Sequence, residues 1–330
     1  MTPIPSLPWS FFLALALCTP ALAAPTVNNL ARDLATVNAF KTRITHDPKN
    51  ALKTWVGSNV CTYEGFVCQK NPDNKNQVQL SSLDFNNFEF GGALGKPTHV
   101  VLTGFLEKLV DLSIIHLNDN QFVGTLPDTS GLPNLVELDA SANYFSGTFP
   151  RTVFHNPNLK FLDLRFNQFT GPIPDQVFTT YKDIETLNLN DNHFSGPIPN
   201  SVGATQASFL SLANNPLSGP IPASLAQAPY LEEALLKNCG LSGTIPKQLG
   251  AGKLLRSIDA SQNRLTGGVP EEVCVDTKAK DKFLDFSNNF LTVPLGPKCQ
   301  ALHASKGLIV TGNCIPGYWK QRPAAECKGH

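Results

Sequence analysis

The 330-residue chain has no excess of charge of either sign, because 26 Lys and Arg balance 26 Asp and Glu and only 16% of its residues are charged. A general polyanion-binding surface, and with it nucleic-acid binding, is therefore not expected. Beyond the N-terminus the chain also lacks the run of roughly 20 apolar residues that a membrane helix needs. No Asn-x-Ser/Thr glycosylation site occurs. With 42% apolar residues the chain can bury a core, so disorder is not expected either.

The N-terminus predicts a removed signal peptide over residues 1–23. An apolar run over residues 11–17 is followed by Ala21-Leu22-Ala23, a small-x-small cleavage signal. No Lys or Arg precedes this run. The alternative is a buried N-terminal helix, but three prolines ahead of the run oppose it. We therefore expect a secreted, soluble protein without a membrane span.

One phrase, L-x-L-x-x-N-x-L-x-G-x-I-P, recurs along the chain, for example over residues 115–127 and 162–174. Its Asn, here called the anchor, returns every 23 to 26 residues, which is a leucine-rich repeat period. Cys239 replaces the Asn in one coil. The anchors are Asn120, Asn143, Asn167, Asn192, Asn215, Cys239, Asn263 and Asn289.

Each letter of the phrase has a physical role. The alternating L-x-L predicts a short strand whose leucines face the core and whose middle residue faces solvent. Successive strands would stack into one parallel sheet on the concave side of an α/β solenoid, a right-handed superhelix of about ten coils. The anchor amides would satisfy buried backbone groups between coils. Cys239 is expected as a buried free thiol, with an intermolecular disulfide as the alternative.

Seven cysteines remain after the predicted signal peptide, and six of them lie towards the two ends. In an exported protein this clustering favours disulfide caps over zinc, for which Cys-x2-Cys pairs are missing, so no metal or cofactor is expected. Adjacency suggests the pairs Cys61–Cys68, Cys274–Cys299 and Cys314–Cys327, although the sequence leaves other pairings open. The predicted organisation is a helical N-terminal cap over 24–79, repeats over 80–295 and a C-terminal disulfide cap over 296–330.

Both caps resemble those of plant leucine-rich repeat extensin-like proteins. The matching segments are Trp55-Val-Gly-Ser-Asn-Val-Cys61-Thr-Tyr-Glu-Gly-Phe-Val-Cys68 and Asn313-Cys-Ile-Pro-Gly317 with Glu326-Cys327. Because the sequence stops at His330 without a Ser-Pro-rich segment, it resembles members that lack the extensin tail. The resemblance implies that the repeat domain binds small basic cysteine-containing signalling peptides in the cell wall or apoplast. A homodimer, a cell-surface receptor or a wall polysaccharide are further partners that it allows.

The concave strand positions are the candidate binding surface. Their middle column and the residues just before two anchors carry many carboxylates, which would attract a basic partner. Asp in Leu-Asp-Leu is, however, common in such repeats whatever they bind. A second cluster is formed by Phe161, Arg165 and Phe166, which we expect on one strand, with Phe209 in the Phe161 column two strands away; these rings can also pack on neighbouring side chains. The acidic and imidazole candidates are Asp84, His116, Asp119, Asp139, Asp163, Asp191, Asp259 and Asp285.

Catalytic motifs such as Gly-x-Ser-x-Gly or His-Glu-x-x-His are missing, so we do not expect an enzyme. The sequence therefore favours a secreted binding protein. Two alternatives remain. The first is an inhibitor of a wall-degrading polygalacturonase, although the second cysteine pair that such inhibitors carry in the N-terminal cap is missing. The second is a structural wall protein that binds polysaccharide.

Overall fold

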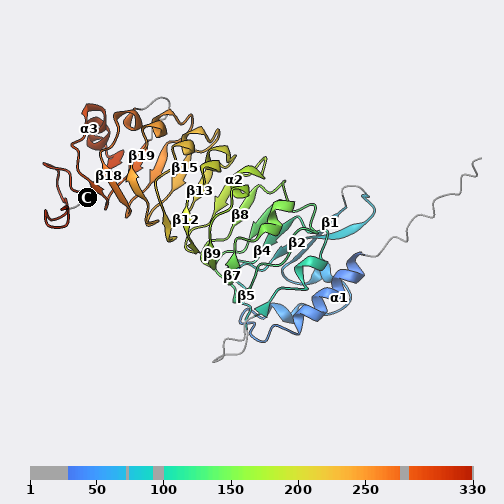
Figure 1. Cartoon of the computed structure of the whole chain (residues 1–330). Coiled ribbons are helices and arrows are strands. Elements are labelled where there is room, and N and C mark those ends of the chain that lie inside the picture. The colour runs from blue at the N-terminus through green and yellow to red at the C-terminus, as the bar shows by residue number, and fades with distance from the viewer. Residues whose placement is uncertain (1–28, 72–73, 92–99, 276–281, 329–330) are drawn as a thin grey trace, which may run out of the picture.

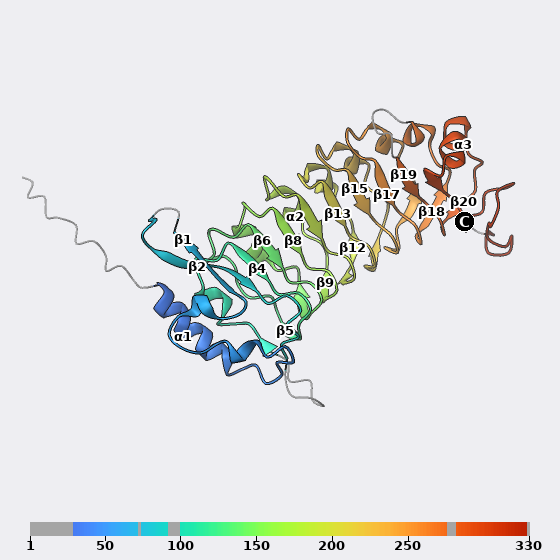
Figure 2. The same cartoon turned by 180° about the vertical axis from the view of Figure 1, so that it is seen from behind.

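The computed structural model describes residues 29–71, 74–91, 100–275 and 282–328. The predicted signal peptide therefore lies outside the described residues. The chain forms an elongated stack of coils that runs from α1 at one end to α3 at the other (Figure 1). Figure 2 shows the same stack from behind, with the strands side by side along its length.

Among the described residues, eleven strands form one long sheet. From β2 onward neighbouring strands are parallel and in register, so that Leu162, Leu187 and Leu210 lie beside one another. Among the described strands of this sheet, β1 alone pairs antiparallel, with β2. The strands of this long sheet are β1 (Phe66–Lys70), β2 (Val78–Asp84), β4 (Ile114–His116), β6 (Glu137–Asp139), β8 (Phe161–Asp163), β10 (Thr186–Asn188), β13 (Phe209–Ser211), β15 (Glu233–Leu235), β17 (Ser257–Asp259), β19 (Phe283–Asp285) and β21 (Leu308–Ile309).

In the ranges that the structure describes, shorter strands form three further sheets, mostly just after the anchors. One sheet contains β3 (Val100–Val101), β5 (Phe122–Gly124), β7 (Tyr144–Thr148), β9 (Gln168–Gly171) and β11 (His193–Phe194). A second pairs β12 (Gly196–Pro197) with β14 (Leu217–Ser218), and the third contains β16 (Ser242–Thr244), β18 (Arg264–Gly267) and β20 (Phe290–Leu291).

Each coil returns to the long sheet through a short helix or 3-10 turn, the return side of the solenoid. The α-helices are α1 (Asn29–Lys41), α2 (Gln176–Thr179) and α3 (Pro297–Ala304). The 3-10 helices are η1 (Ala51–Lys53), η2 (Val60–Thr62), η3 (Leu106–Lys108), η4 (Arg151–His155), η5 (Asn200–Ala204), η6 (Ala223–Gln227), η7 (Lys247–Ala251) and η8 (Glu271–Cys274).

The core runs through the middle of every coil. The first leucine of the L-x-L phrase is fully buried in coil after coil, as at Leu138, Leu162 and Leu187. Each such side chain contributes about 1.5–3 kcal/mol through burial. A coil cannot bury these residues alone, which is why the stack needs both neighbours and caps.

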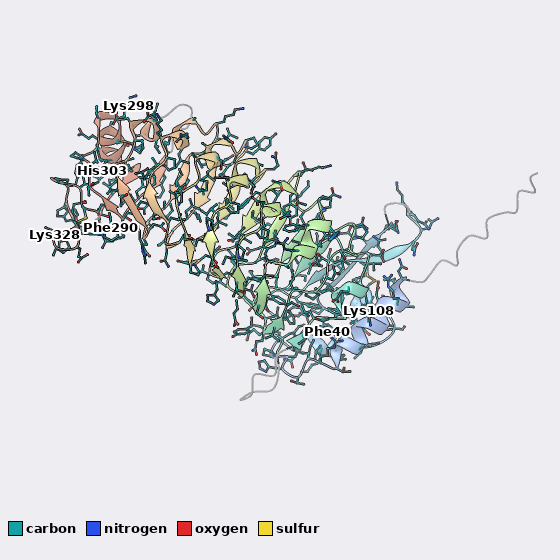
Figure 3. The ribbon with its side chains drawn as sticks, viewed as in Figure 1. Phe40, Lys108, Phe290, Lys298, His303 and Lys328 are labelled. Atoms are coloured by element: carbon teal, nitrogen blue, oxygen red, sulfur yellow. A yellow bond between two sulfur atoms is a disulfide. The ribbon has the colours of Figure 1, made fainter. Side chains whose placement is uncertain are left out.

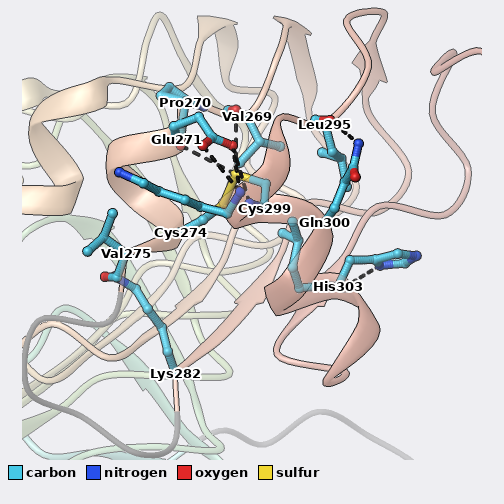
Figure 4. The surroundings of a disulfide bond; sticks show 12 residues. Val269, Pro270, Glu271, Cys274, Val275, Lys282, Leu295, Cys299, Gln300 and His303 are labelled. Carbon is cyan, nitrogen blue, oxygen red and sulfur yellow. Dashed lines mark hydrogen bonds between the residues drawn. A yellow bond between two sulfur atoms is a disulfide. The ribbon is translucent and has the colours of Figure 1, made fainter.

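The caps close both ends with disulfides. Cys61–Cys68 joins η2 to β1, and Trp55 packs in the same cap with its indole Nε1 donating to the Glu64 carbonyl at 2.9 Å. At the other end Cys274–Cys299 joins η8 to α3, and the Glu271 carboxylate accepts from the backbone N–H of Cys299 at 3.3 Å (Figure 4). Cys314–Cys327 closes the last segment. These are the three pairs that adjacency in the sequence suggests.

Candidate functional site

The anchor amides hold neighbouring coils together. Asn143 is typical: its Oδ1 accepts from the backbone N–H of Phe122 at 3.0 Å, while its Nδ2 donates to the carbonyl of Leu117 in the previous coil at 2.8 Å. All seven Asn anchors are at most 7% exposed. The anchor amides therefore satisfy buried backbone groups between coils, as predicted, and their role is structural.

The sequence analysis did not identify one further anchor residue. Asn313 is fully buried, accepts from the backbone N–H of Leu291 at 3.0 Å and donates to the carbonyl of Phe286 at 2.9 Å. It follows β21 and lies 24 residues after Asn289, so the repeat spacing itself could have revealed it. The ladder thus continues into the segment that the sequence reasoning assigned to the C-terminal cap.

Cys239 is a buried free thiol, as predicted. Its Sγ contacts the Leu212 carbonyl of the previous coil at 3.2 Å, but it offers no amide oxygen to that coil. The N–H of Leu217, which an Asn at this rung would serve, turns instead to the Asn215 carbonyl at 2.7 Å. Burial raises the pKa of the thiol to about 12, so it is inert at neutral pH.

The aspartates of the middle column have a structural task that the sequence did not reveal. One carboxylate oxygen of each accepts from the backbone N–H two residues later, at 2.9 Å for Asp139, 2.9 Å for Asp259 and 2.8 Å for Asp285. Such Asx-type bonds fix the turn that leaves the strand. Each half-buried carboxylate therefore has one oxygen committed to the fold and keeps the other for an additional contact.

Asp163 corrects the prediction of a solvent-facing column. It is only 2% exposed, and its neighbours Asn188 and Ser211 on the next two strands are buried as well. Asp163 accepts from the Arg165 backbone N–H at 3.0 Å and from Asn188 Nδ2 at 3.2 Å. Burial raises its pKa to about 6. Three successive residues at the centre of this column are thus buried, and Asp163 is part of the packing.

The remaining polar candidates are divided between the strands and the turns after them. His116 lies on β4 with its Nε2 3.3 Å from the Glu137 carboxylate of the next strand. Asp84 is exposed at the end of β2. Asp119 and Asp191 lie one residue before their anchors with φ of 56° and 54°, in the left-handed region that Asp tolerates well. The two aspartates thus lie in the turns beyond the ends of the strands.

The aromatic cluster is only partly as predicted. Phe161 and Phe209 share a register position, with Thr186 between them, and both are half-buried. Arg165 and Phe166, however, follow β8 instead of lying on it. Phe166 is 52% exposed at a φ of 53°, a conformation that is costly for a bulky side chain. The left-handed backbone recurs at this position in successive coils, as at Ala142 and Asp191, whereas the exposed ring beside the half-exposed Arg165 is particular to this coil.

Acidic residues at the start of the strands were missed. Glu137 and Glu233 occupy the first position of β6 and β15, where the side chains share a face with the middle column. Glu232, one residue earlier, pairs with Arg256 at 2.8 Å. The sequence signal was available, because the position before each Leu follows the same period as the anchors. The long-sheet face, defined as the outward positions of β2 to β21, is therefore more acidic than the middle column alone.

Within the described part of the chain, no group of three or more His, Cys, Asp or Glu could hold a metal ion. Likewise, none of the helices within the described ranges is long and apolar enough to span a bilayer.

Comparison with known proteins agrees with this architecture. The Leucine Rich Repeat family matches residues 158–179, 183–204 and 207–228. The ectodomain of the Arabidopsis receptor kinase GASSHO1/SCHENGEN3, solved with Casparian strip integrity factor 2, superposes with a TM-score of 0.68 at 24% identity, over 86% of this chain and 36% of that one. HAESA from Arabidopsis, solved with the peptide hormone IDA and a co-receptor, gives 0.57 at 22% identity, over 86% and 54%. The fold is that of a leucine-rich repeat protein.

The sequence similarity is more specific than the fold. Leucine-rich repeat extensin-like protein 4 of Arabidopsis thaliana is 36% identical over 91 residues, which are 28% of this chain and 17% of that protein. The predicted resemblance to the leucine-rich repeat extensin-like proteins is therefore confirmed. Since the match spans less than a fifth of that relative, its activity and partners do not carry over with the similarity.

Proposed function

We propose that this protein is a secreted, non-catalytic binding protein of the plant cell wall or apoplast that recognises small basic cysteine-containing peptides on its long-sheet face. The observation that carries the proposal is the row of half-buried carboxylates on this face, each with one oxygen fixed by the turn and one left for a partner. Asp139, Asp259 and Asp285 show this arrangement. A cationic peptide gains charge-assisted hydrogen bonds there without reordering the side chains.

Two further observations support a peptide as the ligand. Parallel strands spaced about 4.8 Å apart offer a surface of roughly 40 Å, long enough for an extended chain or a small fold. Phe166 with Arg165 provides an exposed aromatic and guanidinium pair of the kind that dominates binding energy at interfaces. The receptor ectodomain of HAESA, which shares the fold, was solved with a peptide hormone.

The decisive experiment separates charge from fold. Replacing Asp by Asn keeps an oxygen for the turn but removes the charge, so a combined variant should stay folded while losing the basic peptide. Capture from apoplastic fluid on the immobilised chain, followed by mass spectrometry, should recover small basic cysteine-containing peptides with the unchanged protein. The variant should recover at least ten-fold less. It combines Asp84→Asn, Asp139→Asn, Asp259→Asn and Asp285→Asn.

A matched control removes as many carboxylates from the return side and should capture the peptides as the unchanged protein does. It combines Asp128→Asn, Asp175→Asn, Asp183→Asn and Glu272→Gln, all of them exposed. Recovery that is insensitive to ionic strength would contradict the acidic-face mechanism, because surface attraction between charges is screened by salt. Recovery of a polygalacturonase without any peptide would favour the inhibitor alternative instead.

A further inference from the structure

A second candidate site lies off the long-sheet face, where the chain turns out of β15, β17 and β19. An open pocket of about 540 Å³ occurs there near the C-terminal end. Figure 3 shows Phe290, one of its lining residues, on the same side of that end as Lys328 and away from Lys298. The residues that matter for the argument are Asn238, Gln262, Arg264, Asn288, Phe290 and Arg322.

This pocket carries a net positive charge. Arg264 is exposed at the start of β18, and its guanidinium has no hydrogen-bond or ion-pair partner among the described residues. Arg322 is held in place: its Nε donates to the Asn289 carbonyl at 2.8 Å and its guanidinium lies 4.4 Å from the centre of the Phe290 ring. Glu326 pairs with Arg322 at 3.2 Å and balances one of the two charges. One guanidinium therefore remains for an anionic ligand.

Three primary amides line the same pocket in a row. Asn238, Gln262 and Asn288 take the same place in successive coils, one residue before each anchor, and all three are exposed. Coil spacing separates neighbours in such a row by about 4.8 Å. Asn238 donates to Asn214 Oδ1 at 3.1 Å, which leaves its own Oδ1 as an acceptor. Each amide combines a donor and an acceptor, the pairing that a hydroxyl group needs.

The composition of the pocket argues against a peptide. Phe290 is its large apolar side chain, and the Arg322 guanidinium covers the ring. Peptide sites usually depend on aromatic or aliphatic anchors. The same row near the N-terminal end forms another pocket, of about 320 Å³, but Glu89 and Asp119 line it. Guanidinium groups beside amides thus characterise the C-terminal pocket and are not a property of the repeat.

We propose that the C-terminal pocket binds a sugar acid, that is, a uronic acid residue of an acidic oligosaccharide. The carboxylate pairs with Arg264, with Arg322 forming part of the pocket wall, and the ring hydroxyls pair with the amides of Asn238, Gln262 and Asn288. This proposal does not depend on the peptide-binding function, because none of these residues belongs to the middle column of the long sheet.

The test uses trigalacturonate as the probe and calorimetry with the full chain. Arg264→Gln should weaken binding at least ten-fold, since it removes the unpaired cation. The matched control is Arg256→Gln, which removes another exposed arginine of the same coil, one that lies outside the pocket and pairs with Glu232; this variant should bind as the unchanged protein does. Neutral galactotriose should bind at least ten-fold more weakly than trigalacturonate.

A second variant tests the sugar contacts separately from the charge. Gln262→Ala should weaken trigalacturonate several-fold and leave the non-sugar carboxylate tricarballylate unaffected. The row tolerates alanine in this left-handed conformation, as Ala142 shows with a φ of 50°. Equal affinity for trigalacturonate and tricarballylate would overturn the proposal in favour of a general anion site. Equal affinity for galactotriose, preferential binding of a peptide carboxylate, or an unaffected Arg264→Gln variant would overturn it as well.

Discussion

At the scale of single residues, the same polar side-chain type does opposite things depending on its place in the coil. Asn192 is 4% exposed and its side chain bonds four backbone groups, whereas the side chain of Asn214 is exposed and bonds only to neighbouring side chains. A buried amide is retained because the backbone groups around it have no water to replace it. The position of an Asn in the repeat therefore predicts its structural role better than its residue type does.

Replacing the buried anchor should be costly. Asn192→Ala leaves the N–H of Phe169 and the carbonyls of Leu164 and Leu189 without this partner. At about 1–3 kcal/mol for each group that stays unsatisfied, we expect a loss of at least about 2 kcal/mol. Urea denaturation followed by circular dichroism measures this change. The control Asn214→Ala removes only exposed side-chain hydrogen bonds and places alanine in the left-handed region, at a φ of 55°, so it should cost no more than about 1 kcal/mol. Equal losses in the two variants would contradict the ladder.

Asp163 should make stability depend on pH. Its pKa is raised by burial from 3.8 to about 6, so the folded state favours the neutral acid. The resulting stabilisation is complete below pH 3.8 and is lost as the pH rises through 6, at most about 3 kcal/mol. The stability of Asp163→Asn minus that of the unchanged protein should therefore be larger at pH 7.5 than at pH 4.

Melting temperatures at the two pH values measure this difference. Asn at position 163 keeps an oxygen for the Arg165 N–H and brings an amide towards Asn188, whose buried Oδ1 has no partner among the described residues. Asp259→Asn is the matched change at a half-buried place in the same column and should show a smaller difference. A pH dependence identical in Asp163→Asn and in the unchanged protein would refute the argument.

At the scale of elements, the ends of the stack depend on devices that the repeats do not need. α3 begins with Pro297, and the Glu271 carboxylate from η8 accepts from its first N–H groups. The Cys274–Cys299 disulfide ties the same two elements across 25 residues of sequence. An inner coil is held by neighbours on both sides, whereas the last coils have a neighbour on one side only.

Removing that disulfide should release the C-terminal cap. The double variant Cys274→Ala/Cys299→Ala loses a constraint on the unfolded chain worth about 3 kcal/mol for a loop of this length. We expect protease cleavage to begin after residue 296 while the central coils stay intact, as read by mass spectrometry of the fragments. Cys61→Ala/Cys68→Ala, at the opposite end, serves as the control. An unchanged cleavage pattern in the first variant would show that Glu271 and packing suffice.

At the scale of the whole molecule, a net charge of zero hides a separation of charge. The long-sheet face carries carboxylates such as Asp139, Asp259 and Asp285, while Arg264 and Arg322 line a pocket near the C-terminal end. Because the solenoid is extended, the two regions are presented on different sides of the last coils and can engage different partners. A compact fold of similar composition would bring such opposite charges closer together, and they would then neutralise each other.

The repeat phrase determined the coil, the strand register, the buried anchors and the buried thiol of Cys239, because periodic leucines and amides can be satisfied together in only one stacking arrangement. The sequence could also suggest the disulfide pairs, since adjacent cysteines at the ends are the easiest to join. The tertiary structure alone decided that Asp163 is buried, that the column aspartates fix turns, and that residues 58 positions apart, Arg264 and Arg322, line one pocket. These facts depend on neighbours from other coils, and a one-dimensional pattern cannot give the distances between them.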